Sequence, residues 1–416
     1  MKVLLVSTFY RYGGAAIAAK RVAESLKKQS IDTELIYLMD KKWEFEGSLL
    51  SGFYWKLKFY VLFFFERFLL RIFLSKKIHL FKFSLARIGS NFTKHPAIQK
   101  ADIINFHWVH FSFFSMPAIS ELAQSKSVFW TMQDMWIFTG GCHYSFDCLG
   151  YQSDCAGCFY MKKNFESIPR NILASKSKLF KDGGLNLIAT STWMKSQALQ
   201  SAIFRDADIP VIPNAIDLDI FKPLEKNGRI NTDDRNFKIL IGAVDTRDPR
   251  KGFQYLDELI MLLHTKIRSI ELMVFGETNP TTSSLPCKTT LLGTISGDRE
   301  MVKVYCNADV YLHLAVQDNA PLVVSEALAC GLPVVSFDSG GVGDIVISDE
   351  TGYLVEVGDV KGMAENLVLL GDKKVRKSIS LKAREKAVEM CDSVSVAKSY
   401  EHVFRNFYEP MPVEKP

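Results

Sequence analysis

Residues 317–341, QDNAPLVVSEALACGLPVVSFDSGG, contain the pattern that decides the fold. Pro321 suits the first position of a helix, and Gly331 suits its end. The apolar β-branched run 333–337 then predicts a buried strand, and the turn 339–341 contains two glycines. A loop, a helix, a strand and a glycine turn in this order form one repeating unit of an α/β fold.

Two carboxylates in this stretch predict a binding site. Asp318 lies in the loop before the helix, and Glu326 lies eight positions later, inside it. The N–H groups of a first helical turn, here around 319–323, bind anionic oxygens. Glu326 interrupts a nearly all-apolar helix, where a charge is costly unless it has a partner. The combination suits a nucleotide sugar, which is part phosphate and part polyol. The alternative is a capping Asp318 and a solvated Glu326.

The segment resembles the acidic-x7-acidic signature of retaining GT-B glycosyltransferases, in glycosyltransferase family 4. The resemblance implies that Glu326 and the loop before it hold a nucleotide diphosphate sugar, with UDP or GDP as its nucleotide. It also makes Asp318 and Glu326 candidate catalytic residues. The donor-binding residues that it implies in this stretch are Asp318, Asn319, Ala320, Pro321, Leu322 and Glu326. Glutamate is commoner in the family where this sequence has Asp318, so the reach to the sugar is shorter here.

The whole chain has 416 residues, of which 12% are aromatic and 23% are charged, with a formal net charge of +5. This length allows two domains of ordinary size, and this composition excludes a disordered chain. The first residues, MKVLLVSTFYRYGG, predict a buried strand and a glycine turn, not a signal peptide. Eight cysteines without a secretory signal favour a reducing, cytoplasmic compartment.

Strand and helix patterns alternate in both halves of the chain, which predicts parallel sheets with helices on both faces. Among these elements are a short strand at 211–212 and a helix from Gly252 to His264. We therefore expect two Rossmann-like, doubly wound α/β domains, residues 1–212 and 237–394, joined by a Pro-, Asn- and Asp-rich linker, 213–236. The resembling family has the same Ile-Pro-Asn phrase at this hinge, and in its GT-B architecture the two domains face each other across a cleft. The resemblance also implies that a C-terminal helix within 395–416 crosses back to the first domain.

Polar groups follow the strands expected in the first domain. Gly13-Gly14 comes after the first strand and opens an Ala-rich helix, so bare N–H groups lie where phosphates and polar substrates bind in such folds. His107 and the pair Gln133-Asp134 follow two further strands at the same edge, which makes them candidate catalytic residues. Relatives often have His where this chain has Gln133, and a glutamine is no acid or base near neutral pH. The alternatives are a tight packing turn at the glycines and a satisfied core histidine at His107.

Arg250-Lys251-Gly252 precedes the first helix of the second domain. In the family, a Lys-Gly at this site contacts the donor diphosphate, and the resemblance implies this donor-binding and catalytic role for Lys251. A fixed cation there stabilises the diphosphate leaving group more in the transition state than in the ground state. Many relatives have an arginine where this chain has Ala243, and we expect Arg250 to supply the guanidinium as a donor-binding residue. The alternative is Arg247, whose default interpretation is a solvated surface arginine. The resemblance implies that catalysis requires no cofactor and no divalent metal at the leaving group.

Four cysteines lie in the loop 139–160 with the spacing C-x5-C-x6-C-x2-C, at Cys142, Cys148, Cys155 and Cys158. This spacing fits a tetrahedral structural zinc site that holds together a loop without a core of its own, with His143 as a spare ligand. Similar loops, which begin with the same Thr-Gly-Gly turn, occur in a subgroup of family 4. The alternative is four reduced cysteines.

The basic aromatic insert 53–87 contains the longest apolar stretch, FYVLFFFERFLLRIFL at 59–74. This stretch is too short for a standard membrane span and carries Glu66, Arg67 and Arg71. A Phe- and Leu-rich helix with basic flanks fits a segment that lies on an anionic lipid surface. The alternative is an amphipathic helix packed on its own domain.

Together these patterns predict a retaining hexosyltransferase that moves a hexose from a nucleotide diphosphate sugar to a lipid-linked glycan acceptor, in bacterial surface polysaccharide biosynthesis. We expect it in the cytoplasm, peripheral on the inner face of the cell membrane, with no nucleic-acid partner. Two alternatives remain open. One is a nucleotide-sugar epimerase of GT-B fold, and the other is an inactive GT-B scaffold, which Gln133 and Ala243 motivate.

Overall fold

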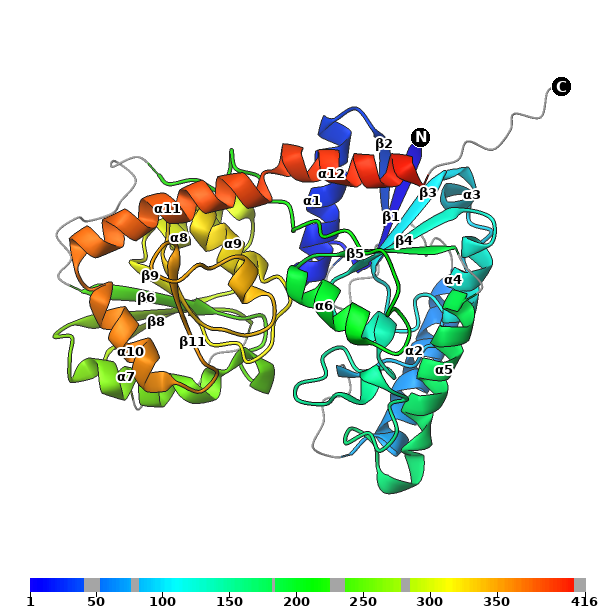
Figure 1. The fold of residues 1–416 in the computed structure, drawn as a ribbon, viewed down its shortest axis with the longest axis horizontal. Helices are drawn as coiled ribbons and strands as arrows, with labels where there is room; N and C mark the ends of the chain where they lie inside the picture. Colours follow the sequence, from blue (N-terminus) through cyan, green and yellow to red (C-terminus); the bar gives the residue numbers. More distant parts are fainter. Residues whose placement is uncertain (41–52, 76–81, 182–183, 225–235, 278–284, 408–416) are drawn as a thin grey trace. The chain divides into compact units, whose positions relative to one another are not determined.

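The computed structural model describes residues 1–40, 53–75, 82–181, 184–224, 236–277 and 285–407 (Figure 1). The chain divides into two compact units. Unit 1 comprises residues 1–213 together with 394–416, and unit 2 comprises residues 214–393. The division therefore falls one residue after the end of the first expected domain, and part of the expected linker, 225–235, lies outside the described residues.

Unit 1 is built on a parallel sheet with the strand order β2-β1-β3-β4-β5. Its strands are β1 Lys2–Phe9, β2 Asp32–Met39, β3 Ile103–Trp108, β4 Ser127–Met132 and β5 Leu185–Ala189. Its helices are α1 Gly14–Lys28, α2 Phe53–Phe73, α3 Pro96–Lys100, α4 Met116–Ala123, α5 Ser167–Lys181, α6 Thr192–Gln200 and α12 Ser393–Asn406. The strand order reverses between β1 and β3, and such sheets bind ligands at the carboxyl ends of the strands beside this switch point.

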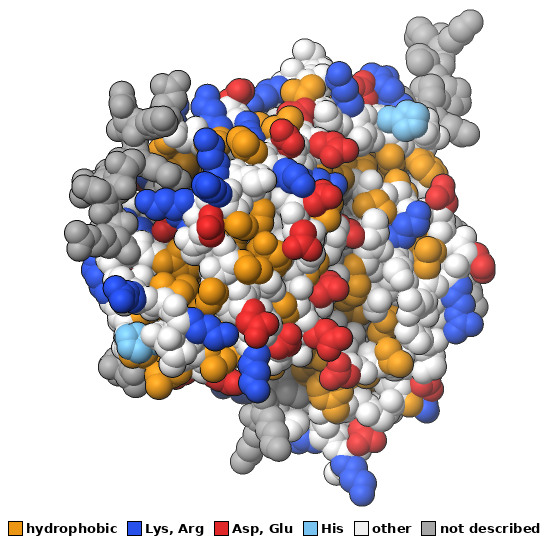
Figure 2. Space-filling model, turned by 60° about the vertical axis from the view of Figure 1, so that its left-hand side comes forward, with side chains coloured by type: hydrophobic (Ala, Val, Ile, Leu, Met, Phe, Trp, Pro, Cys, Tyr) orange, Lys and Arg blue, Asp and Glu red, His pale blue; other side chains and the backbone are white. Residues whose placement is uncertain are grey.

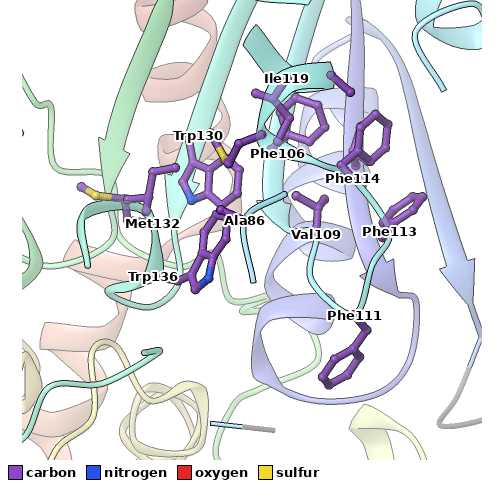
Figure 3. Close-up of a cluster of buried hydrophobic side chains, with 14 of the residues drawn as sticks. Ala86, Phe106, Val109, Phe111, Phe113, Phe114, Ile119, Trp130, Met132 and Trp136 are labelled. Carbon is purple, nitrogen blue, oxygen red and sulfur yellow. The ribbon is translucent and has the colours of Figure 1, made fainter. Parts of the chain in front are cut away.

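An aromatic core covers one face of this sheet (Figure 3). Trp130 of β4 stacks on Trp136, with 5.7 Å between ring centroids and 19° between ring planes. Phe106 of β3 meets Phe114 edge to face at 5.2 Å, and Ile119 lies beside Phe106 (Figure 3). Each of these large rings buries a large apolar surface. The cluster therefore fixes the positions of β3 and β4 relative to the loops that follow them.

Helix α12 covers the opposite face of β4. Successive strand residues point to opposite faces, so Phe129 points away from the core around Trp130. Its ring meets Phe404 of α12 at 4.9 Å, and the Tyr400 hydroxyl lies 3.4 Å from Thr131 Oγ1. The helix after residue 393 therefore belongs to unit 1, although it follows unit 2 in the chain.

Helix α2 has charged side chains on its buried side. Glu66 is fully buried, and its Oε1 accepts the N–H of Leu85 at 2.7 Å. Its Oε2 accepts the Ser112 hydroxyl at 2.8 Å and lies 2.9 Å from Arg67 Nη2. Several aromatic residues of the same helix, among them Phe63, also pack into the core. This side of α2 is thus packed on its own unit, which agrees with the alternative of an amphipathic helix packed on its own domain.

The other side of α2 presents an apolar stripe. Its members are more than a third exposed and recur at helical spacing: Leu57, Val61, Phe64, Phe65, Phe68 and Ile72. Phe64 is 61% exposed, so packing within unit 1 does not account for this surface. Helix α2 therefore combines a buried polar anchor with an exposed hydrophobic face.

Unit 2 contains a parallel sheet with the strand order β11-β10-β9-β6-β7-β8. Its strands are β6 Phe237–Gly242, β7 Ile270–Phe275, β8 Lys288–Gly293, β9 Val310–His313, β10 Val334–Phe337 and β11 Gly352–Val355. Its helices are α7 Leu256–His264, α8 Asp298–Cys306, α9 Leu322–Ala329, α10 Val360–Leu369 and α11 Lys373–Cys391. Helices α7 and α10 lie on one face of the sheet, and α8, α9 and α11 lie on the other (Figure 1). The strand order reverses between β6 and β9, which is the switch point of this unit.

Three local boundaries differ from the sequence prediction. The sequence predicts a short strand at 211–212, where the structure has a single bridge to β5. It also predicts a helix from Gly252, but α7 begins at Leu256 because Gly252 is left-handed and residues 253–255 form a 3-10 turn. Pro321 caps α9 with an extended backbone and is not its first helical residue.

Candidate functional site

The carboxyl edge of the unit 2 sheet, beside its switch point, gathers the predicted donor residues. Strand β6 leads to the 3-10 turn η6, Pro249–Lys251, and β9 leads to the loop 314–321. Gly252 ends η6 with φ 72°, and a Cβ there would lie 1.7 Å from the carbonyl oxygen of Leu314. Glycine alone permits this conformation and this close approach, which bring Lys251 to the loop after β9.

Lys251, Arg250 and Asp318 form one charged cluster. Lys251 Nζ lies 2.6 Å from Asp318 Oδ2, and Arg250 Nη1 lies 3.3 Å from the same oxygen. Arg250 also donates through Nη1 to the carbonyl oxygen of Gln317 at 2.9 Å. Arg247, in contrast, is 75% exposed and pairs with a neighbouring aspartate. Of the two arginines that could supply a guanidinium, Arg250 is the one in the cluster.

The charges in this cluster stabilise one another. Burial raises the pKa of Asp318, but Lys251 and Arg250 outweigh burial and hold this pKa below its ordinary value. Burial and then Arg250 lower the pKa of Lys251, while Asp318 opposes this shift. The carboxylate therefore holds both cations at the edge of the sheet, and an anionic ligand would compete with it for them.

The loop that carries Asp318 is held by hydrogen bonds. Asn319 donates its N–H to Asp318 Oδ1 at 3.1 Å, and Asn214 donates its side-chain amide to the carbonyl oxygen of Ala320 at 3.1 Å. Hydrogen bonding within α9 begins with the N–H of Val324. The N–H groups of Leu322 and Val323 precede this ladder, whereas Asn319 donates to Asp318 and Pro321 has no N–H. Oxygen binding at this helix end remains a prediction.

The glycine turn 339–341 packs against this loop. Gly340 has φ 62°, and a Cβ there would lie 1.9 Å from the carbonyl oxygen of Asp318. Gly341 donates its N–H to that oxygen at 2.9 Å, and Ser339 donates its hydroxyl to the carbonyl oxygen of Ala315 at 2.6 Å. The turn therefore supports the backbone of the Asp318 loop.

Glu326 is 6% exposed, which excludes the alternative of a solvated glutamate. The Tyr305 hydroxyl donates to Glu326 Oε2 at 2.9 Å. Burial and then the charge of Glu326 raise the pKa of Tyr305, so the phenol keeps its proton. Burial, followed by the charges of Glu326 and Asp318, also raises the pKa of Tyr311. Lys251 therefore contacts Asp318 directly. Tyr311 lies near the carboxylates of both Asp318 and Glu326.

His313, the last residue of β9, belongs to this site and was missed by sequence reasoning. It is 4% exposed, and its Nε2 lies 4.0 Å from Asp318 Oδ2. Burial lowers its pKa to about 3, against the opposing effect of Asp318, so the imidazole is neutral. Its position at the carboxyl end of a strand is the signal that could have found it, since the same argument singles out His107.

The carboxyl edge of the unit 1 sheet begins with the predicted glycine pair. Gly13 has φ 83° and precedes α1, which begins at Gly14. Within the described part of the chain, a Cβ on Gly13 would meet no atom within 4 Å. Close packing therefore does not explain why residue 13 is a glycine, whereas the positive φ of its backbone does.

His107 and Gln133 lie together at this edge. Gln133 Nε2 is 3.4 Å from His107 Nδ1, and Asn105 Nδ2 is 3.3 Å from His107 Nε2. Burial lowers the pKa of His107 to about 3, so its imidazole is neutral. Both ring nitrogens have protein neighbours, as in the core-histidine alternative, and a catalytic role for His107 and Gln133 remains a prediction.

Asp134 has a different set of partners from Gln133. Its Oδ2 accepts from Trp108 Nε1 at 2.8 Å and from His143 Nδ1 at 2.6 Å, and its Oδ1 accepts the N–H of Trp136 at 2.9 Å. Burial raises the pKa of Asp134, but His143 and the other donors outweigh burial and lower the pKa to about 2. Asp134 therefore anchors the start of the loop 139–160, and its predicted catalytic role stays untested.

The cysteines of the loop 139–160 line one cavity, together with Phe83, Gly140 and Tyr151 among others. All four are free thiols, and Cys155 is buried while the other three are half-buried. Zinc binding by this set remains a prediction.

Two surface properties bear on the expected partners. Among the described residues, no helix has the length and apolar character needed to cross a membrane. Figure 2 shows one face of the molecule, on which acidic side chains lie between basic ones. That face does not present the uniformly basic surface that favours binding to a nucleic-acid backbone.

Residues 237–373 match the family described as Glycosyl transferases group 1. The chain is 34% identical over 98 residues to N-acetyl-alpha-D-glucosaminyl L-malate synthase of Bacillus anthracis, a match that covers 23% of this chain and 26% of that protein. It is 24% identical over 258 residues to the putative colanic acid biosynthesis glycosyl transferase WcaC of Escherichia coli, which covers 59% of this chain and 62% of WcaC. The matches thus span between 26% and 62% of these relatives.

Solved structures match over nearly the whole chain. Sucrose-phosphate synthase from Thermosynechococcus elongatus superposes with a TM-score of 0.67 at 17% identity, over 98% of this chain and 99% of that one. Anabaena HepE in complex with UDP and glucose gives a TM-score of 0.63 at 15% identity, over 98% and 100%. At these identities the likeness shows the fold. The chain therefore has the GT-B fold, and its residues 237–373 match the glycosyl transferases of group 1.

Proposed function

We propose that this protein is a retaining glycosyltransferase that moves a hexose from a nucleotide diphosphate sugar to a lipid-linked glycan acceptor. The observation that carries the proposal is the cluster of Lys251, Arg250 and Asp318 at the switch point of unit 2. These residues lie within the segment that matches the glycosyl transferases of group 1. The binding of UDP and glucose by HepE, which shares the fold, supports a donor of the same class.

The proposed roles in unit 2 follow from charge. Lys251 and Arg250 bind the diphosphate, whose charge grows as its bond to the sugar breaks. A preorganised donor aimed at such a charge contributes about 3 to 4 kcal/mol to transition-state stabilisation. Asp318 holds both cations before the donor arrives, and Glu326 accepts hydrogen bonds from sugar hydroxyls. Because protein cations and the N–H groups of α9 neutralise the leaving group, we expect no requirement for a divalent metal.

In unit 1 the proposed task is to orient neutral groups. His107 is uncharged and Gln133 is an amide, so this pair suits hydrogen bonds to hydroxyls better than proton transfer. Gly13 and Gly14 offer open backbone at the same edge. We propose that departure and attack occur on one face of the sugar, so that the product keeps the anomeric configuration of the donor. Proton NMR of the product measures that configuration, and an inverted anomer would overturn this part.

The proposed acceptor is carried by lipid, which the apolar stripe of α2 supports. Two basic side chains accompany the stripe at the end of the helix: Arg71 is exposed, and Lys162 donates to the carbonyl oxygen of Ile72 at 2.6 Å. Exposed phenylalanines beside cations favour the interface of an anionic bilayer. The name of WcaC, a putative colanic acid glycosyl transferase, points to surface polysaccharide as the product class. We accordingly place the protein on the cytoplasmic face of the cell membrane.

The activity is tested by nucleotide release from a panel of UDP- and GDP-sugars, with and without lipid-linked acceptors. A transferase releases nucleotide from one donor only when an acceptor is present. An epimerase converts the sugar without acceptor and without net nucleotide release, and an inactive scaffold does neither. A thermal-shift screen of the same donors identifies the ligand first, since a bound donor raises the apparent melting temperature by mass action.

Membrane binding is tested separately from catalysis. The double variant Phe64→Ser/Phe68→Ser removes two rings from the apolar stripe, and each exposed ring that enters the lipid interface contributes about 1 to 2 kcal/mol. We therefore expect sedimentation with anionic vesicles to fall at least about tenfold, with an unchanged melting temperature. Met261→Ser is the matched control, because Met261 is 56% exposed on unit 2. Equal sedimentation of the double variant and the wild type would refute the membrane role of α2.

A further inference from the structure

The cysteine loop has features that the proposed reaction does not use. Cys142, Cys148, Cys155 and Cys158 come from successive turns of the chain, yet their side chains line the same cavity. The described loop 139–160 has one short regular element, the 3-10 turn Gly150–Gln152. Its sulfur atoms are free thiols, so no disulfide holds it together.

Hydrogen-bond donors are directed at these sulfur atoms. The N–H of Gly150 donates to Cys148 Sγ at 3.4 Å. Backbone groups of Tyr160 and Met161 bond to Cys158, and the backbone of Gly140 bonds to Cys155. A protonated thiol is a weak acceptor, whereas a thiolate is a strong one. Such an arrangement of backbone donors is therefore suited to thiolates.

The backbone of the loop is strained at two positions. Cys155 and Phe146 have left-handed backbones, with φ 55° and 49°. Residues other than glycine keep such conformations only where the surroundings hold them, at a cost of order 1 kcal/mol each.

We propose that Cys142, Cys148, Cys155 and Cys158 bind one zinc ion as a tetrathiolate. Each thiol releases one proton to solvent as its sulfur bonds to the metal, so two positive charges enter and four leave. The completed site carries a net charge of −2. The side chain of Lys176, which is fully buried and interacts electrostatically with Cys142 and Cys155, offsets part of this charge when its amine is protonated.

A second group of ligand atoms defines the competing assignment. Among the described residues, the group whose ligand atoms already lie within 4.8 Å of one another is His110, Asp134 and His143. The four sulfurs must move closer to reach metal distances. Asp134 and His143, however, are already bonded to each other, and Lys176 lowers the pKa of His110 by its charge, after burial and His143. A cation beside Lys176 is better stabilised by four thiolates than by one carboxylate.

Zinc at this position would connect two parts of unit 1. Cys142 is next to His143, which holds Asp134 at the sheet edge. Shortly after Cys158 the chain meets the end of α2, where Ser75 donates its N–H to the carbonyl oxygen of Tyr160 at 2.9 Å. The metal would therefore fix both the loop behind Asp134 and the C-terminal end of the helix that carries the apolar stripe.

The test measures metal in the full-length protein purified without added chelator. Mass spectrometry of metals is expected to find about one zinc per chain. Replacement by Co²⁺ is expected to give the intense visible and sulfur-to-metal charge-transfer bands of tetrahedral cobalt thiolate. Titration with a mercurial reagent is expected to release the zinc as the thiols react.

Variants assign the ligands. Cys155→Ser and Cys158→Ser should lose the bound zinc, while Cys287→Ser, at a half-buried cysteine of unit 2, should retain it. His110→Gln should also retain it. Zinc lost in His110→Gln but kept in the cysteine variants would overturn the proposal in favour of the histidine set, as would a cobalt spectrum without thiolate bands. Absence of zinc, or two disulfides among the four cysteines by mass spectrometry, would overturn it outright. The wild-type cobalt spectrum decides the matter even if a cysteine variant does not fold.

Discussion

Both units place a buried aspartate at the carboxyl edge of a parallel sheet, but the two aspartates have different neighbours. Asp134 in unit 1 is bonded by an indole, an imidazole and a backbone N–H. Asp318 in unit 2 is paired with an ammonium and a guanidinium. In both cases the neighbours outweigh burial and lower the pKa of the carboxyl group.

This difference separates two kinds of ligand. The donors around Asp134 are fixed parts of unit 1 that hold a loop, and the nearby His107 is kept neutral. The cations around Asp318 sit on flexible stems and can exchange a carboxylate for a phosphate. One doubly wound topology thus provides an edge suited to neutral hydroxyls in unit 1 and an edge suited to an anion in unit 2.

The largest expected effect comes from removing a cation of unit 2. Lys251→Ala should lower kcat/KM for the donor at least about 100-fold, because the leaving diphosphate loses a fixed positive charge. Arg247→Ala is the matched control, since Arg247 is exposed and outside the cluster, and it should keep full activity. Steady-state nucleotide release measures both. Equal activity of Lys251→Ala and the wild type would remove the basis for assigning unit 2 to the donor.

A smaller effect is expected at the two buried glutamates, one in each unit. Glu326→Gln should lower kcat/KM by about 10- to 100-fold, the usual value of a charged hydrogen bond to a sugar hydroxyl. Glu66→Gln should instead lower the free energy of unfolding by about 1 to 3 kcal/mol, because Glu66 accepts bonds from Leu85 and Ser112. Donor kinetics and urea unfolding of both variants separate the roles. A Glu66→Gln enzyme with weakened donor binding would contradict this division.

The last expected effect is the change in stability per unit of pH. Burial lowers the pKa of both His107 and His313 to about 3, whereas each titrates near 6.5 when unfolded. Between these values the unfolded chain binds protons that the folded chain does not, so stability falls as pH drops from about 6.5 towards 4. Each histidine contributes a slope of about 1.4 kcal/mol per pH unit. Urea unfolding of His107→Gln should show a slope smaller by that amount, and an unchanged slope would mean that His107 is charged in the fold.

Much of the fold could be predicted from the sequence, because its signals are local. Apolar runs, glycine turns and a helix ended by Gly331 predicted two Rossmann-like units, and the α/β fold is confirmed. The boundary error at α7 has a non-local cause. Residues 253–255 form a 3-10 turn because Gly252 must adopt a left-handed backbone against Leu314, and that contact is made by a distant strand end.

The site was less predictable, because its geometry depends on contacts between distant residues. The sequence makes Arg250 the expected guanidinium and Arg247 its alternative, but only the path of η6 shows that Arg250 reaches Asp318. Glu66 looks like a stray charge in an apolar stretch, since two of its partners, Leu85 and Ser112, lie 19 and 46 residues away. Gln133 and Asp134 are adjacent in sequence, yet they bond to different side chains. The position of Arg247 outside the cluster makes Arg247→Ala a control, and the hydrogen bonds of Glu66 make Glu66→Gln a test of stability.

The position of α12 has a consequence for the order in which the protein is made. Phe129 of the fourth strand is covered by Phe404, which the ribosome adds some 275 residues later. Unit 2 is continuous in the chain and can complete its core while still being synthesised, whereas unit 1 waits with one face of β4 uncovered. A nascent chain stopped after residue 393 should therefore expose that face to chaperones and proteases, although every strand of both sheets has already been translated.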